Sequence, residues 1–543
     1  MDSRAKTLLE QGDKLYSDRM SLMSFWQCVA DQFYVERSDF TVARTLGEDF
    51  AADLNSSYPL IVRRELGNAF SAMLRRRDLE WFHVTTDRED RLDNSGKQWL
   101  EMATGIQRRA MYDRQSQFIR ATKEGDHDFA AFGQTVMSEE INYKNMALLY
   151  RCWHLRDVVW CEGHDGAIAD RHHKLRPTAR WLAQQFGKDK LHQNIQTILD
   201  RNPHQEISCR RIVVPSDTFD GQHKFKWISL YIDTDNQEVI DERESLTPIY
   251  VIPRWQTVSG SQYAYSPAVV AGLPDARLLQ AMTLTLLEAG EMAVRPPMIA
   301  VQEALSGGVK LFSGGITQVD AAYDERLGEV LRPVTQDSRA LPFGMDMSKE
   351  KQEMLAAAFF LNKLTAMPHG KDMTAYEASE WVKEYIRGAL PLFEPMETEY
   401  NGALCEQTFE DLMKVNAFGP PMEIPKSIRG SEVRFRFESP LSDAIEQQKS
   451  QKFVQAKGLI AEAMALDPAT AVTVDARIAL REALSGIGVP AKWMRSEEAV
   501  EQHAKALEEQ QQMQQQAAMV QQAAVTGEQI GAAGKSIAEA EAA

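Results

Sequence analysis

One segment of helix length constrains the fold more than any other, because it has no charged face. No residue between Arg277 and Glu288 carries a charge, and its apolar side chains point in most directions around a helix: Leu278, Leu279, Met282, Leu284, Leu286 and Leu287. A helix that is apolar on all sides must be covered on all sides. The uncharged stretch is too short to span a bilayer, which needs about 20 residues. The segment must therefore be covered by protein.

The flanking residues predict a helix from 266 to about 294. Ser266 is a typical N-cap, and Pro267 suits a first helical turn. Pro274 interrupts the pattern and Asp275 restarts it, while two prolines end it at 296 and 297. Two kinds of cover are possible. The helix packs inside the chain's own core, or identical helices of neighbouring copies pack around an axis.

A chain of 543 residues is expected to form two to four domains. The order of elements predicts a mainly α fold with α+β parts. Hydrophobic periodicity indicates helices over most of 1–160, with a short strand at 81–84, and strands dominate from 150 to 260. The later segments are a Gly-rich stretch (298–345), a second apolar helix (348–364), a long helical stretch (374–418), a short strand (431–441), further helices and a Gln/Ala-rich tail from about 497.

Charge and cysteine content limit the class of protein. The net charge of −17 argues against tight, static wrapping of DNA, although it leaves loose passage of DNA open. Five scattered cysteines are typical of a reduced, intracellular protein. The first twenty residues have no apolar core of a signal peptide, and no apolar run reaches membrane length. We expect a soluble protein with no membrane partner.

No motif in the sequence predicts catalysis. The segment "GAAGKS" (531–536) has the wrong spacing for a phosphate-binding loop, and no strand precedes it. No hydrolase motif appears, so we expect neither an enzyme nor a cofactor. Six residues lie close enough in sequence to suggest zinc, but their spacings fit a plain β-hairpin around "GHDGA" better: Cys152, His154, Cys161, His164, His172 and His173.

Arginines form the strongest basic cluster, at 63–64 and 75–77. A phosphate-binding patch is one interpretation. Acidic residues at 65, 78 and 80 lie alongside, which favours a solvated or subunit-pairing face.

Three segments, in order, resemble the portal (head-to-tail connector) proteins of short-tailed, podovirus-type bacteriophages. These segments are "PRWQTVSGSQYAYSPAVVAGLPDARLLQAM" (253–282), "DMTAYEASEWVKE" (372–384) and "VRFRFESPLSDAIEQQ" (433–448). The resemblance covers nearly the whole chain and implies a portal-type fold, assembled as a ring around a central channel. Its regions would be a wing (1–265), a stem helix (266–295), a clip (296–345), a second stem helix (346–364), a channel loop (365–373), a long helix with the wing return (374–440), and a helical crown and tail (441–543).

The resemblance also implies a function and partners. The ring, usually a dodecamer, would sit at one capsid vertex of the virion after assembly in the host cytoplasm, and double-stranded DNA would be packaged and ejected through it. The clip would dock the large terminase, the packaging ATPase, and later the tail adaptor and nozzle proteins. Scaffold and major capsid protein would contact the wing, and internal ejection or core proteins are further partners. His369 and Lys371, in the channel loop, would face the DNA.

Two other functions stay open at this point. A helical structural adaptor without a channel would bind partners but would need no closed ring. A nuclease acting on DNA would need a metal site, and no metal-ligand motif supports one.

Overall fold

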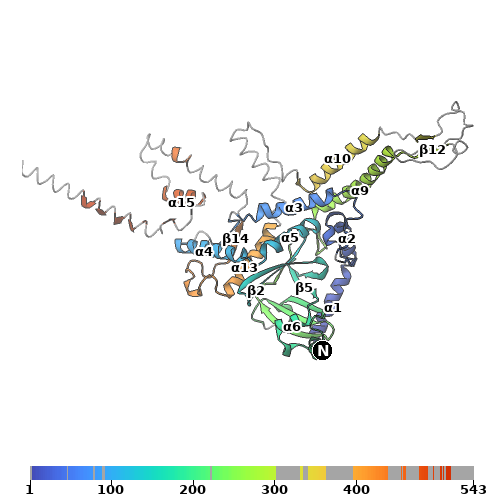
Figure 1. The fold of residues 1–543 in the computed structure, drawn as a ribbon. Helices are drawn as coiled ribbons and strands as arrows, with labels where there is room; N and C mark the ends of the chain where they lie inside the picture. The colour runs from blue at the N-terminus through green and yellow to red at the C-terminus, as the bar shows by residue number, and fades with distance from the viewer. Residues whose placement is uncertain are drawn as a thin grey trace, which may run out of the picture. The chain divides into compact units, whose positions relative to one another are not determined.

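The computed structural model describes residues 3–45, 47–77, 80–88, 92–219, 223–300, 331–333, 340–361 and 396–437, and short stretches between 454 and 514, of which 476–486 is the longest. The chain divides into two compact units. The first comprises Met1–Trp81 and Arg109–Asp411, and the second Phe82–Arg108 and Leu412–Ala543. Figure 1 shows the fold, which is mainly helical with two larger sheets in the first unit.

The larger sheet of the first unit is antiparallel, with strand order β4-β5-β6-β7-β8. Its strands are β4 (Val158–Glu162), β5 (Ile168–Leu175), β6 (Cys209–Pro215), β7 (Trp227–Asp233) and β8 (Glu238–Ser245). Alternation along β6 and β7 gives one apolar face, which packs against α1 (Ser3–Asp18) through Leu8 and Leu9. On the other face lie α6 (Ala179–Phe186) and α7 (Gln193–Arg201). The predicted hairpin at "GHDGA" is confirmed, because it joins β4 to β5.

A smaller sheet connects these strands to the helices of the first unit. Its order is β3-β2-β9, and α5 packs on β2 and β3. The elements are β2 (Val136–Asn142), β3 (Ala147–Trp153), β9 (Tyr250–Val251), α2 (Met20–Phe33), α3 (Tyr58–Leu74) and α5 (Phe118–Phe132). Buried aromatic side chains fill the space between these elements; Trp255, for example, stacks on Phe129 with ring centroids 5.2 Å apart. Short elements complete this part: η1 (Val35–Arg37), η3 (Leu155–Asp157), η4 (Lys188–Lys190), α8 (Ser216–Phe219), β10 (Gln256–Thr257) and β11 (Ala264–Tyr265).

Two long helices of the first unit extend away from this core. They are α9 (Pro267–Val294) and α10 (Ala340–Ala358), and the short strands β12 (Met298–Ala300) and β13 (Leu331–Pro333) pair next to them (Figure 1). The sequence predicts the second helix from 346, whereas α10 begins at Ala340. Pro342 lies in the first turn of α10, where a missing N–H costs little, so the helix can include the residues from Ala340 onward. The chain continues with a π-helical turn, η7 (Met396–Gly402), and α13 (Ala403–Lys414).

The second unit contains a ribbon of two strands that are distant in sequence. β1 (Phe82–Thr86) pairs antiparallel with β14 (Val433–Phe437), with Phe82 opposite Phe437. Both short strands are predicted by the sequence, but their pairing is not. The residues of α4 (Asn94–Met111) up to Arg108 belong to this unit, where Thr104 Oγ1 accepts a hydrogen bond of 3.0 Å from the Val84 amide. The remaining elements are η8 (Pro421–Glu423) and α15 (Ala476–Gly486).

Candidate functional site

The helix pair α9–α10 is the candidate functional site, and glycines let its two helices approach closely. A Cβ at Gly272 would lie 2.9 Å from Leu355 Cδ1 and 3.0 Å from Phe359 Cε2. Towards the other end of the pair, a Cβ at Gly344 would lie 2.8 Å from Leu286 Cδ2. These two contacts show that the helices run antiparallel. Lys351 of α10 also reaches Asp275 of α9, with Nζ 3.2 Å from Oδ1.

The first half of α9 is covered by the chain itself. Its N-terminus is capped as predicted, because the Ser266 hydroxyl accepts a hydrogen bond from the Val269 amide. The residues buried here face α10, α2 and α5: Ala268, Val269, Gly272, Leu273, Ala276, Leu279 and Gln280. This half of the helix therefore belongs to an ordinary intrachain core.

From Leu278 to its C-terminal end, α9 leaves apolar side chains exposed on both sides of the stripe that faces α10. At about 100° per residue, Leu278 and Met292 lie on one side of that stripe, and Leu287 and Val294 on the other. Their exposed fractions are 43%, 44%, 55% and 82% in that order. Three charged residues, Arg277, Glu288 and Glu291, lie between the two apolar flanks, and the exposed Leu284 lies on the same face. We call the two flanks the Leu278 flank and the Leu287 flank.

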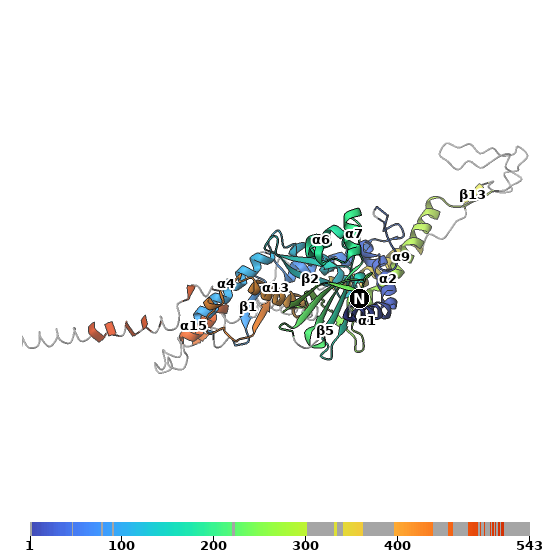
Figure 2. The ribbon, with the colours of Figure 1, turned by 90° about the horizontal axis from the view of Figure 1, so that it is seen from below.

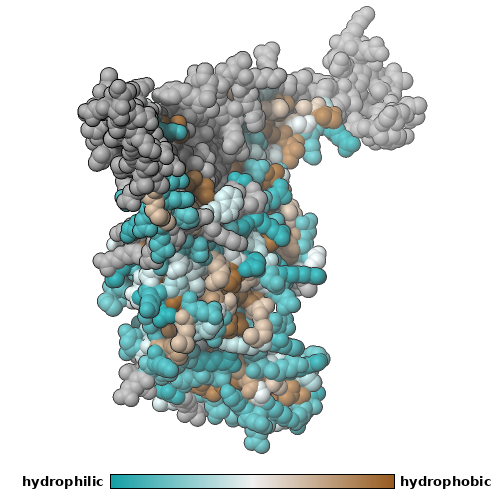
Figure 3. Space-filling view, turned by 90° about the vertical axis from the view of Figure 1, so that its left-hand side faces the viewer, coloured by the Kyte–Doolittle hydropathy of each residue, from teal (hydrophilic) through white to brown (hydrophobic). Residues whose placement is uncertain are grey.

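The outer surface of α10 also exposes large apolar side chains, next to charged residues. The apolar ones are Phe343, Met345, Met347 and Met354, and the charged ones are Asp346, Lys349, Glu350 and Glu353. Figure 3 shows hydrophobic residues gathered on the helix pair where it leaves the rest of the first unit, at the upper right beside the grey atoms. Methionine side chains adapt to irregular surfaces, so this face suits contact with another protein.

One detail of α9 differs from the sequence prediction. Pro274 does not interrupt the helix, which is continuous from Pro267 to Val294, so Asp275 does not restart it. Pro274 has no N–H to donate to the carbonyl of Val270. Val270 lies on an exposed side of the helix, where water can replace the missing donor.

A comparison with protein families identifies the kind of protein. The family described as bacteriophage head to tail connecting protein matches residues 5–494, most of the chain. The chain belongs to this connector family. It is therefore a structural, non-enzymatic component of a bacteriophage that joins head to tail, and the prediction that it is not an enzyme is confirmed by this membership.

Two relatives of the chain are named as portal proteins. The probable portal protein of Bordetella phage BPP-1 is 25% identical over 457 residues, which span 81% of this chain and 79% of the relative. The portal protein of Salmonella phage epsilon15 is 20% identical over 463 residues, or 82% of this chain and 80% of the relative. The predicted resemblance to phage portal proteins is thereby confirmed.

Solved structures give weaker matches. Chains from the virion of a native gene transfer agent particle and from the neck of an empty particle of that kind match with TM-scores of 0.37 and 0.35. Each match covers 79% of this connector and 94% of the other chain, at 10% identity.

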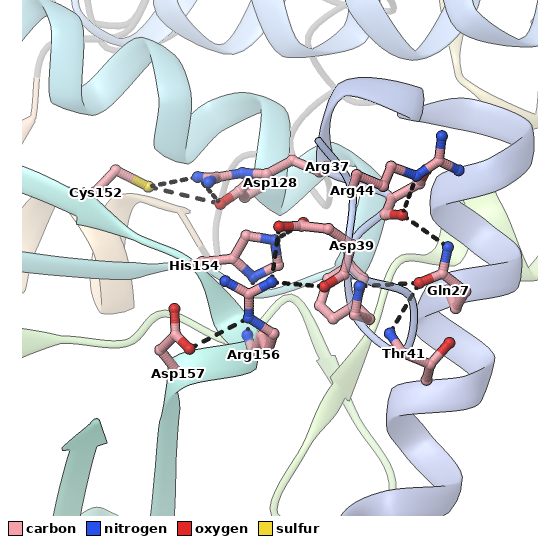
Figure 4. A network of polar contacts seen from close by, with 12 residues as sticks. Gln27, Arg37, Asp39, Thr41, Arg44, Asp128, Cys152, His154, Arg156 and Asp157 are labelled. Atoms are coloured by element: carbon pink, nitrogen blue, oxygen red, sulfur yellow. Dashed lines mark hydrogen bonds and ion pairs between the residues drawn. The ribbon is translucent and has the colours of Figure 1, made fainter. Parts of the chain in front are cut away.

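The six zinc candidates of this connector do not gather at one site, and some of them have other partners. His154 Nε2 lies 2.7 Å from Asp39 Oδ1, and Cys152 Sγ lies 3.6 Å from Asp128 Oδ2, as Figure 4 shows. His172 points to the α1 face of the sheet, and His173 to the opposite face. No group of three or more His, Cys, Asp or Glu residues among the described residues could hold a metal ion.

The arginine cluster is divided between buried and exposed positions. Arg63 is buried and donates to the Phe33 carbonyl, with its guanidinium 3.8 Å from the Tyr34 ring centroid. Arg75 is buried as well and forms an ion pair with Asp126. The interpretation as a solvated or subunit-pairing face is therefore wrong for these two residues, because their charges are satisfied inside the first unit. The phosphate-patch interpretation fails for them for the same reason.

The Arg75 site is a fully buried polar network that the sequence analysis missed. The Arg75 guanidinium binds Asp126 of α5 and donates to Asn401 Oδ1 of η7 at 2.7 Å, and it lies over the Tyr400 ring. Burial raises the pKa of the Asp126 carboxyl to about 6, although Arg75 opposes this shift. The network joins residues more than 300 positions apart, so no local sequence signal could reveal it.

Two sets of predicted residues lie outside the described part of the chain: His369 and Lys371 of the channel loop, and the "GAAGKS" segment at 531–536. Most of the predicted clip lies outside it as well. Among the residues that the structure describes, no helix is long and apolar enough to cross a membrane.

Proposed function

We propose that this connector assembles as a closed ring of identical subunits, a dodecamer, around a channel that double-stranded DNA passes through during packaging and ejection. The observation that carries the proposal is the pair of exposed apolar flanks on α9. A contact between different patches on successive copies repeats head to tail and closes into a ring when the rotation fits. The Leu278 flank of one copy would pack against the Leu287 flank of the next.

The regions keep the roles that the portal resemblance implies. α9 and α10 would form the stem (266–295 and 346–364), with the clip at 296–345 and the channel loop at 365–373. Residues 1–265 and 374–440 would form the wing, and 441–543 the crown and tail. Membership of the connector family and the two portal relatives support this assignment.

The chain's charge suits a channel that does not hold DNA tightly. Each copy carries a net charge of −17, and an acidic ring disfavours stable contacts with phosphates. Lys371 and His369 would give transient holds on the DNA. Replacing each by alanine should change retention of packaged DNA and leave ring assembly intact; unchanged retention would refute their role.

The partners follow from the same assignment. The clip would bind the large terminase during packaging and then the tail adaptor and nozzle proteins. The wing would contact scaffold and major capsid protein, and internal ejection or core proteins would bind the ring inside the capsid. The ring would assemble in the host cytoplasm and remain at one capsid vertex.

The proposal is tested by breaking one flank at a time. Leu278→Glu places a charge on one flank and Leu287→Glu on the other. Each variant alone should remain unassembled, because every contact in the ring needs both flanks. An equimolar mixture should give heterodimers, because each variant keeps one intact flank. Val258→Glu is the matched control, since Val258 is as exposed as Leu287 and lies outside the helix pair.

Native mass spectrometry distinguishes the outcomes. Heterodimers from the mixture and rings from the Val258→Glu control would support the proposal. Rings that persist in both single variants would refute the assignment of the two flanks as the contact between copies.

A further inference from the structure

The loop between η1 and α3, residues 38–57, is hydrogen-bonded near each end to a different glutamine side chain. We call this loop the strap. At its start, Gln27 of α2 accepts hydrogen bonds from the amides of Phe40 and Thr41, at 2.9 and 3.0 Å. The Gln27 amide group donates in turn to the carbonyl of Ser38, at 2.9 Å. The Gln27 side chain thus forms hydrogen bonds with three backbone groups that are not paired within a helix or a sheet.

At the end of the strap, Gln280 of α9 plays the same role. Its Oε1 accepts from the amides of Asn55 and Ser56, both at 2.8 Å, and its Nε2 donates to the Ser56 carbonyl at 2.8 Å. Gln280 is buried to 8% exposure. It is the last buried residue along α9.

The start of the strap is also fixed to the sheet region. Asp39 binds His154 Nε2 and Arg156 Nη1, both at 2.7 Å, as Figure 4 shows. Arg156 donates to the Asp39 carbonyl as well, at 2.7 Å. The hydrogen bond from His154 is the main cause that lowers the pKa of the Asp39 carboxyl, so the carboxylate stays charged and paired.

The strap therefore links the body of the first unit to the middle of α9. Its central residues are mostly exposed and protrude beside α2 and α9 (Figure 2). From Gln280 to Val294 the helix extends by about 21 Å at 1.5 Å per residue. A small change in the direction of α9 at Gln280 therefore becomes a larger displacement of Val294 at the far end of the helix.

We propose that the strap sets the direction in which the α9–α10 pair leaves the body, with Gln280 as the positioning residue. Packing of α9 on α2 and α5 holds the helix at its N-terminal half, and the three hydrogen bonds of Gln280 fix it at the point of exit. Because each flank must meet its counterpart on the next copy, a fixed direction favours ring closure. This consequence rests on the proposed function; the local role of Gln280 does not.

Two substitutions separate the hydrogen bonds of Gln280 from its size. Gln280→Met keeps the length of the side chain and removes all three bonds. Gln280→Glu keeps the acceptor for the Asn55 and Ser56 amides and loses the donor to the Ser56 carbonyl. Gln184→Met is the control, because Gln184 is an exposed glutamine on α6.

The direction of the helix pair can be measured in the full chain by electron paramagnetic resonance. One spin label is placed on Cys28, which is exposed on α2, and one on Glu291→Cys near the end of α9, with Cys152 and Cys161 replaced by Ser. Labelled chains are diluted with unlabelled chains, so that only distances within one copy are recorded. Closed rings are counted in the same samples.

We expect a narrow distance distribution for the parent chain and for Gln184→Met. Gln280→Met should broaden the distribution and reduce the fraction of closed rings several-fold, and Gln280→Glu should lie between the two. An unchanged, narrow distribution in Gln280→Met would overturn the proposal. Normal ring closure despite a broadened distribution would overturn its role in assembly. Failure of the parent chain to form rings would refute the proposed function, while the distances would still decide the role of Gln280.

Discussion

Gly272 of α9 and Phe359, the residue after α10, touch where the two helices meet the core: a Cβ at residue 272 would lie 3.0 Å from Cε2 of the Phe359 ring. Phe359 and the neighbouring Leu355 are fully buried and cannot move aside easily. Gly272→Ala should therefore lower the free energy of unfolding by about 1–3 kcal/mol, as overpacking does. Denaturant unfolding at fixed protein concentration measures the effect.

The control for this prediction is in the same helix. Apart from the backbone of its own helix and its two chain neighbours, no atom of the described residues lies within 4 Å of a Cβ built at Gly290. Gly290→Ala should therefore stabilise the chain by up to about 1 kcal/mol, the difference in helix propensity. Equal effects of the two substitutions would contradict the close contact at Gly272.

We expect a large decrease in the free energy of unfolding when one partner of the buried Arg75–Asp126 ion pair is removed. Asp126→Asn leaves the Arg75 charge buried without its counter-charge, which should cost about 3–5 kcal/mol of unfolding free energy. Glu124 lies on the same helix and pairs with Arg120 at the surface. Glu124→Gln should change the stability by less than about 1 kcal/mol. A loss for Asp126→Asn no larger than that of the control would show that the buried pair does not stabilise the fold.

Because His172 is buried, we expect the protein to lose stability at acidic pH. Burial, with a smaller effect of Arg210, lowers the pKa of His172 to about 3, below its usual 6.5. Below pH 6.5 the unfolded chain binds a proton at this position and the folded chain does not, so the unfolding free energy falls as the pH falls towards 3. The loss from His172 should be roughly 1–3 kcal/mol by pH 4.5.

His172→Phe tests this contribution. Neither ring nitrogen of His172 has a hydrogen-bond partner among the described residues, so an apolar ring removes the titration without breaking a bond. The variant should lose less stability than the parent chain between pH 7 and pH 4.5, in denaturant titrations at each pH. The same loss in both proteins would assign the acid sensitivity to other groups.

Methionine oxidation reports on the surface that the ring would cover. Met292 of α9 and Met354 of α10 are exposed in the single chain, and assembly through the helix pair should protect them from hydrogen peroxide. Met422, at 89% exposure, serves as the control that oxidises in either state. Mass spectrometry of peptides from assembled and unassembled protein measures the rates. Equal oxidation of Met292 and Met354 in both states would place the contact elsewhere.

The sequence predicts the local features of this fold well. The cap at Ser266, the end of α9 before Pro296 and the turn between β4 and β5 all depend on residues that are adjacent in the chain. The absence of charge between Arg277 and Glu288 also identifies α9 as the helix whose apolar side chains the single chain does not fully bury. The start of α10 at Ala340 differs from the prediction, because the residues before 346 were assigned to the Gly-rich segment.

Features that depend on distant contacts could not be predicted. The sequence marks β1 and β14 as strands, but nothing near Phe82 indicates that Phe437 is its partner. In the same way, an arginine next to other arginines gives no sign that Asp126 and Asn401 will enclose it. The role of Gln280 depends on backbone amides more than 220 positions away. The residues next to Gln280 in the sequence give no sign of these hydrogen bonds.

The native mass of the purified chain of 543 residues, together with negative-stain images, is the most direct test of ring assembly. We expect a closed ring with an axial hole and a native mass near a dozen subunits of 61.3 kDa. A chain that stays monomeric even at high protein concentration would contradict ring assembly through the Leu278 and Leu287 flanks. A closed two-fold dimer without a hole would contradict it as well.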